Sequence, residues 1–118
     1  MIRAMTSRGE LEQRVLEVLW ASSAARSVAD VQEELSGERT LAYTTVMTVL
    51  DRLAKKHLVT RERVERAWFY TAAFTQAELL AKELTALVND VAPATRIEAL
   101  QAFAQELSAP ERATLAGS

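Results

Sequence analysis

Three threonines and a neighbouring group of basic residues are the side chains of this sequence best suited to bind another molecule. The hydroxyls of Thr44, Thr45 and Thr48 can form hydrogen bonds, and their methyl groups can lie beside thymine. Six Lys or Arg residues stand between Arg52 and Arg66, against two acidic ones, and such cations contact phosphate oxygens. The pattern favours nucleic-acid binding over the alternative, a charged face that contacts only water.

The residue types on which enzymes and metal sites depend are scarce. Among its 118 residues the chain has no cysteine and one histidine, His57. Disulfides, thiolate metal sites and a cysteine nucleophile are therefore excluded, and one histidine cannot form a nucleophile–base pair alone. We expect no enzyme, no catalytic residue, no metal and no cofactor. His57 is interpreted as an exposed residue at the end of a helix.

The net charge of −2 hides an uneven distribution of charge. Residues 1–72 carry eleven basic and ten acidic side chains, whereas residues 73–118 carry three and six. A local basic patch steers a protein toward phosphate even when the whole chain is acidic. The first residues lack the apolar run of a signal peptide, and no apolar run is long enough to span a bilayer. We expect a cytoplasmic protein without membrane insertion.

Several sites in the sequence have a Ser or Thr followed three residues later by Asp or Glu, a pattern that predicts the start of a helix. These capping boxes are Ser7–Glu10, Ser27–Asp30, Thr75–Glu78 and Ser108–Glu111. Apolar residues at helical spacing follow the first two, and Ser36-Gly37 ends the second helix.

A third helix is predicted after Thr40. Its buried stripe comprises Val46, Val49, Leu50 and Leu53. Its outer face then holds Thr44, Thr45, Met47, Thr48, Asp51, Arg52 and Lys55.

The hydrophobic period then changes from helix to strand. Leu58–Arg63 and Trp68–Ala72 are rich in β-branched and aromatic residues, so we predict a hairpin with Val64–Ala67 between the strands. Its basic residues are Arg61, Arg63 and Arg66. The aromatic residues are interpreted as core or hairpin packing: Trp20, Trp68, Phe69 and Tyr70.

Three helices followed by a hairpin are the plan of a winged helix-turn-helix. The third helix would enter the major groove of double-stranded DNA, and the hairpin would be the wing that contacts phosphate or the minor groove. The predicted DNA-binding residues are Ala42, Tyr43, Thr44, Thr45, Met47, Thr48, Arg52, Lys55, Arg63 and Arg66. Alternatively, Thr44 and Thr45 cap the helix and Met47 is core. A second interpretation of Lys55 and Lys56 is that they are cations placed favourably at a helix C-terminus.

The fold class predicted is mainly α with a small β-hairpin wing. A winged-helix head, residues 1–73, is followed by a helical dimerisation region, residues 74–118. Two further helices, separated by Asn89–Pro93, carry an apolar stripe that includes Leu80, Leu84, Leu87, Val91, Ile97, Leu100, Phe103 and Leu107. This is more apolar surface than the head can cover, so we expect a homodimer. The alternative is that both helices fold back onto their own head.

The segments Gly9–Glu12, Val18–Trp20 and Leu41–Lys56 resemble the penicillinase repressor family (BlaI/MecI/CopY). The likeness runs from about Gly9 to Leu107, and its string Thr-Val-x-Thr-x-Leu-x-Arg-Leu-x-Lys-Lys at Thr45–Lys56 is fairly specific. The resemblance implies a homodimeric winged-helix repressor that binds a pseudo-palindromic operator, with C-terminal helices entwined between subunits. It also implies that the recognition helix reads the groove at Thr44, Thr45, Met47 and Thr48, with Arg52 near the backbone.

The resemblance further implies a way of releasing DNA. In β-lactam-responsive members, a membrane sensor triggers proteolysis of an Asn–Phe bond in a C-terminal helix. The matching position here reads Ala102-Phe103, so the phenylalanine is kept and the asparagine is not. Copper-responsive members carry a C-terminal cysteine motif, so copper sensing is not expected here.

Two other classes of function remain open. One is a ligand-sensing winged-helix regulator of another family, with a small molecule between the head and the later helices. The other is a winged-helix protein-interaction module that no longer binds DNA.

Overall fold

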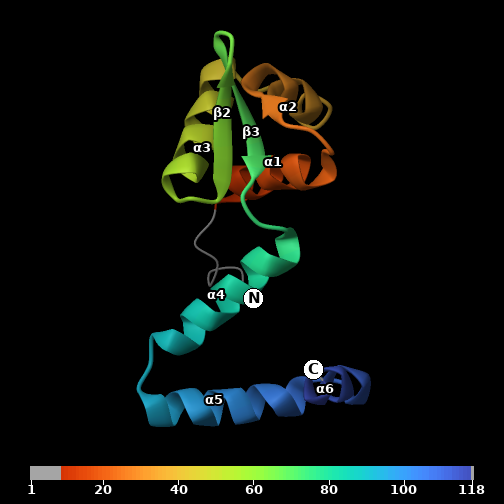
Figure 1. Cartoon of the computed structure of the whole chain (residues 1–118), viewed down its shortest axis with the longest axis vertical. Coiled ribbons are helices and arrows are strands. Elements are labelled where there is room, and N and C mark those ends of the chain that lie inside the picture. Colours follow the sequence, from red (N-terminus) through yellow and green to blue (C-terminus); the bar gives the residue numbers. More distant parts are fainter. Residues whose placement is uncertain (1–8, 118) are drawn as a thin grey trace. The chain divides into compact units, whose positions relative to one another are not determined.

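The computed structural model describes residues 9–117, and within them a small antiparallel sheet accompanies a mostly helical chain (Figure 1). The elements in order are α1 (Glu10–Ala21), β1 (Arg26–Ser27), α2 (Val28–Leu35), α3 (Tyr43–Lys55), β2 (Val59–Val64), β3 (Ala67–Ala72), α4 (Gln76–Asn89), α5 (Pro93–Glu106) and α6 (Ala109–Ala116). The predicted fold class, mainly α with a β-hairpin, is confirmed. The chain divides into two compact units between Leu79 and Leu80.

One apolar core joins α1, α2, α3 and the sheet in the first unit. The predicted stripe of α3, Val46, Val49, Leu50 and Leu53, is buried there. Side chains of α1 and α2 at helical spacing, Val59 and Tyr70 of the hairpin and Leu79 at the start of α4 complete it. Because one face of α3 is fully occupied by the core, the opposite face is turned outward.

Three of the four predicted capping boxes are confirmed. At the start of α2, the backbone N–H of Ser27 donates to Asp30 Oδ2 at 3.0 Å, and the backbone N–H of Asp30 donates to Ser27 Oγ at 3.1 Å. The first of these bonds holds the pKa of Asp30 below its ordinary value. Equivalent reciprocal bonds begin α4 at Thr75–Glu78 and α6 at Ser108–Glu111.

The predicted start of α1 is wrong. The helix begins at Glu10 with Gly9 as its N-cap, and no side chain caps it. Glu10 therefore occupies the first helical position rather than the third, and Ser7 lies outside the described residues. An acidic residue in the first turn stabilises a helix through the helix dipole, whether or not a capping box is present. The Ser-x-x-Glu pattern therefore did not fix the residue at which α1 begins.

The hairpin is tighter than predicted, and the sheet has one strand more. Val64 pairs with Ala67, so only Glu65 and Arg66 form the turn rather than four residues. Glu65 has φ 58°, as the first central residue of a two-residue hairpin turn requires, although it is not the usual glycine or asparagine. The additional strand β1 pairs with β3 in the sheet order β1-β3-β2, and its two residues are too few to show a period.

The recognition-helix candidate α3 ends in a Schellman motif. The N–H of Leu58 donates to the carbonyl of Leu53 at 2.9 Å, and that of His57 to Ala54 at 3.0 Å. His57 holds the left-handed position with φ 63°, where glycine is usual. The interpretation of His57 as an exposed helix-end residue agrees with this position. The motif turns the chain directly into β2.

The second unit has no core of its own. Among its described residues 80–117, no side chain is buried. The predicted apolar residues of this unit are 43–59% exposed at Leu80, Leu84, Leu87, Val91, Ile97, Leu100 and Phe103. Val91 lies in the connection after α4 rather than on its stripe, and Leu107 is the C-cap of α5. Pro93 opens α5, as predicted.

None of the helices in the described part of the chain is both long enough and apolar enough to pass through a membrane.

We predict that His57→Gly raises the free energy of unfolding by about 1 kcal/mol. A left-handed backbone costs a residue with a Cβ about 1–2 kcal/mol, and the larger backbone entropy of glycine in the unfolded chain offsets part of the gain. Urea unfolding followed by circular dichroism measures the change. His57→Ala keeps the Cβ and is the matched control. Equal unfolding midpoints for both variants would contradict the assignment of strain to this position.

Candidate DNA interface

The outer face of α3 is accessible along its length. Thr44, Thr45 and Thr48 are exposed, and Met47 is 42% exposed between them. The alternative in which Met47 belongs to the core is therefore wrong. The remaining predicted residues of this helix are exposed as well: Ala42, Tyr43, Arg52 and Lys55. Ala42 is the N-cap of α3, and no side chain caps the helix there.

Thr48 already uses its hydroxyl hydrogen within the helix. Its Oγ1 donates to the carbonyl oxygen of Thr44 at 2.8 Å. The hydroxyl can still accept a hydrogen bond, and the methyl group remains on the exposed face. In this conformation, Thr48 offers an acceptor and a methyl group rather than a donor.

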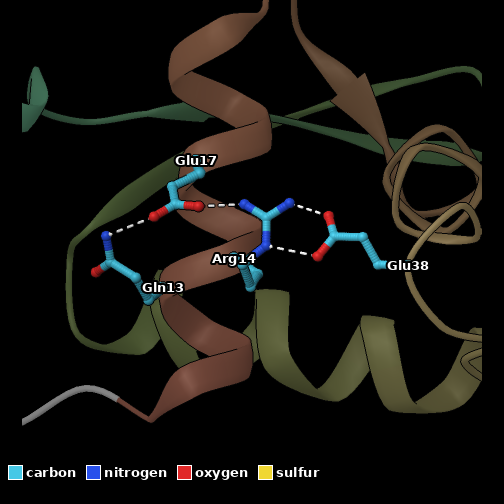
Figure 2. Close-up of polar contacts among 4 residues, drawn as sticks. All are labelled: Gln13, Arg14, Glu17 and Glu38. Carbon is cyan, nitrogen blue, oxygen red and sulfur yellow. Dashed lines mark hydrogen bonds and ion pairs between the residues drawn. The ribbon is translucent and has the colours of Figure 1, made fainter.

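Two hydrogen-bonded contacts hold the turn before α3. Figure 2 shows the guanidinium of Arg14 in α1 between Glu17 and Glu38, and its Nε donates to Glu38 Oε1 at 3.0 Å. This contact holds the pKa of Glu38 below its ordinary value. Gln32 of α2 donates from Nε2 to the carbonyl oxygen of Leu41 at 2.9 Å. Because Glu38 and Leu41 lie between α2 and α3, these contacts fix how the chain enters α3.

The other end of α3 is tied to α1 by an ion pair that the sequence analysis missed. Lys56 Nζ lies 3.0 Å and 3.2 Å from the two carboxylate oxygens of Glu12, which is only 7% exposed. A buried carboxylate needs such a partner. The signal for it is the place of Glu12 on the apolar face of α1, four residues before Leu16. Lys56 therefore has a structural role as the ion-pair partner of Glu12 in α1. Neither interpretation of Lys55 and Lys56 made from the sequence anticipated this role.

The wing brings a second set of cations beside α3. Arg61, Arg63 and Arg66 are exposed on the hairpin and its turn. Arg61 Nη1 lies 3.5 Å from Asp51 Oδ1 of α3, and Lys55 Nζ lies 3.2 Å from the other oxygen of the same carboxylate. Asp51 therefore connects the wing to the recognition-helix candidate.

Trp68 lies outside the core and packs on the hairpin, which is one of the two outcomes expected for the aromatic residues. Its ring is 37% exposed on β3, and the guanidinium carbons of Arg61 and Arg63 lie 4.4 Å and 5.7 Å from the ring centroid. Each such exposed cation–π contact contributes about 0.5–1 kcal/mol. Two of the other aromatic residues belong to the core or pack against it. Tyr70 is buried, and Trp20, which packs against the core, donates its indole N–H to the carbonyl of Phe74 at 2.9 Å.

Two hollows lie near the predicted functional residues. An open groove of about 610 Å³ separates the first turn of α1 from α3, and Thr45 and Arg52 are among its lining residues. In the second unit, a groove of about 310 Å³ between α4 and α5 is lined mainly by apolar residues, including Leu84, Leu100 and Phe103. Within residues 9–117, no three His, Cys, Asp or Glu side chains are grouped to hold a metal ion.

Known proteins and solved structures are similar to this chain over most of its length. The transcriptional regulator BlaI of Mycobacterium tuberculosis (strain CDC 1551 / Oshkosh) is 42% identical over 108 residues, which are 91% of this chain and 78% of that protein. The solution structure of the DNA-binding domain of the repressor BlaI is 27% identical, with a TM-score of 0.55, over 63% of this chain and 89% of that one.

A further structure shows the Bacillus licheniformis BlaI monomeric form in complex with the blaP half-operator. It is 27% identical, with a TM-score of 0.51, and it too covers 63% of this chain and 89% of that one. Both structures support the winged-helix fold of the first unit. The model of the penicillinase repressor family matches residues 8–117. The family is one of repressors, which confirms the expectation that the chain is not an enzyme. The chain belongs to the penicillinase repressor family of transcriptional regulators.

Proposed function

We propose that this protein is a homodimeric transcriptional repressor that binds a pseudo-palindromic operator of double-stranded DNA. The exposed face of α3 enters the major groove, and the wing lies along the phosphate backbone beside it. The observation that carries the proposal is the outward face of α3, where three threonines and Met47 stand next to the exposed cations of α3 and the wing. A relative with this fold is bound to a half-operator, which supports the same role here.

The head, residues 1–73 in this proposal, supplies the DNA contacts, and residues 74–118 supply the dimer. The candidate DNA-binding residues are Ala42, Tyr43, Thr44, Thr45, Met47, Thr48, Arg52, Lys55, Arg63 and Arg66. An inducing signal ends repression in this proposal. The bond Ala102–Phe103 matches the position of the bond cleaved in β-lactam-responsive members of the family, and both residues are exposed on α5. It is the candidate point of cleavage in this proposal, triggered by a membrane sensor-protease system and acting on the repressor in the cytoplasm.

The first test is binding to duplex DNA from upstream of the protein's own gene, across a salt series and with random duplex DNA as competitor. We expect competitor-resistant binding and a negative slope of log K against log salt, with just under one unit of slope for each phosphate contact. Arg63→Glu combined with Arg66→Glu should abolish binding, because it places negative charge against phosphate. Lys82→Glu on α4 is the matched charge-reversal control. Unchanged binding by the double variant would contradict the contact of the wing with phosphate. Weak wild-type binding that is equal for both duplexes would favour a protein-interaction module.

Thr48 tests whether α3 reads bases. We expect Thr48→Ala to change the preference among operator bases by about 1–3 kcal/mol, as loss of a base-edge contact does. Thr48→Val keeps the methyl group and replaces the hydroxyl with a second methyl, whereas Thr48→Ser keeps the hydroxyl and removes the methyl. The pair therefore identifies which of the two groups is read. Competition with single-base operator variants measures the preference. A uniform loss over all sequences would instead make Thr48 a positioning residue.

The dimer is tested at the apolar groove of the second unit. We expect the protein to sediment as a dimer at micromolar concentration, because residues 80–117 bury no side chain of their own. Leu100→Glu should give a monomer, since it places a charge in the groove between α4 and α5. Leu100→Met keeps the volume and should remain dimeric. A wild-type monomer under these conditions would contradict the dimer.

A further inference from the structure

One face of the wing carries an aromatic–arginine cluster at the edge of the core. Across the β2–β3 ladder, Arg61 pairs with Tyr70 and Arg63 pairs with Trp68. Directly paired residues, and residues two apart on one strand, project on the same side of a sheet. Tyr70 is buried, whereas Trp68 lies two residues nearer the turn and is partly exposed. The cluster of Arg61, Arg63 and Trp68 therefore continues the buried face of the hairpin beyond the core.

Contacts within this cluster fix where its charges lie. The Cζ atom of Arg61 lies 4.4 Å from the centroid of the Trp68 ring, and that of Arg63 lies 5.7 Å from it. Arg61 also reaches Asp51 of α3, so the cluster stands on the side of the wing that adjoins α3. The face of an aromatic ring attracts cations, whereas an aliphatic side chain of similar size would not.

Proceeding from the proposed function, we propose that Trp68 is a positioning residue for the wing's contact with the DNA backbone. The ring holds the guanidinium groups of Arg61 and Arg63 at fixed places along the hairpin, so that both meet phosphates beside the groove that α3 enters. Long arginine side chains lose rotamer freedom when they bind phosphate. A ring that holds them before binding reduces this loss.

The test compares wild type, Trp68→Leu and Trp68→Phe on the upstream duplex and on a random duplex of equal length. We expect Trp68→Leu to bind both DNAs about five- to thirty-fold more weakly, as loss of two cation–π contacts implies, and Trp68→Phe to retain most of the affinity. The salt slope should fall by about one to two units as ordered phosphate contacts are lost. In a background of Arg61→Gln and Arg63→Gln, Trp68→Leu should have no further effect, because Trp68 acts through these arginines.

Fluorescence supplies a second measurement. Trp20 and Trp68 are the two tryptophans, so DNA should change the emission of wild type and leave that of Trp68→Phe unchanged. Circular dichroism establishes that the variants are folded.

Three outcomes would overturn the proposal while leaving the repressor function standing. They are wild-type affinity for Trp68→Leu, an equal loss in the Arg61→Gln/Arg63→Gln background, and a loss confined to the upstream duplex. Absence of DNA binding by wild type would overturn both proposals.

Discussion

Burial of one side of α3 is the constraint on which the rest of the interface depends. Val46, Val49, Leu50 and Leu53 recur at helical spacing and fill the core against α1, α2 and the sheet. Removing any of them would leave a cavity, which costs about 2–5 kcal/mol for a large aliphatic side chain cut to alanine. Rotation of α3 about its axis is therefore prevented. The same packing that stabilises the head thus decides that the threonine face points outward.

Polar contacts fix the direction of the two ends of α3, which apolar packing alone does not determine. Arg14 and Glu38 hold the turn before the helix (Figure 2). Glu12 and Lys56 hold its end, and Asp51 and Arg61 connect it to the wing. Most of these groups are at the surface, where ion pairs contribute little free energy. Their effect is geometric, because the proposed entry of α3 into the major groove requires its axis and the wing to stand at a defined relative position.

The local features of this fold could be predicted from the sequence, and the features set by distant partners could not. The spacing of apolar residues, the capping boxes and the change from helical to alternating spacing indicated the helices and the hairpin. These signals are local, because residues close together in the sequence determine them. Strand β1 exists only through its pairing with Phe69 and Tyr70 of β3. The role of Glu12 depends on Lys56, and the exposure of Trp68 depends on where the core ends. Predicting either feature requires knowledge of which segments pack together in the folded chain.

The acidic net charge and the proposed binding of DNA are compatible because the charges are separated along the chain. The excess of acidic residues lies after residue 72, whereas a group of exposed cations lies on α3 and the hairpin. Potential near a surface is governed by charges within about a Debye length, roughly 8 Å at physiological salt. Phosphate beside α3 therefore meets the local cations first. In a dimer, two such patches would act on one DNA, so the affinity would depend on the burial of α4 and α5 as much as on the arginines themselves.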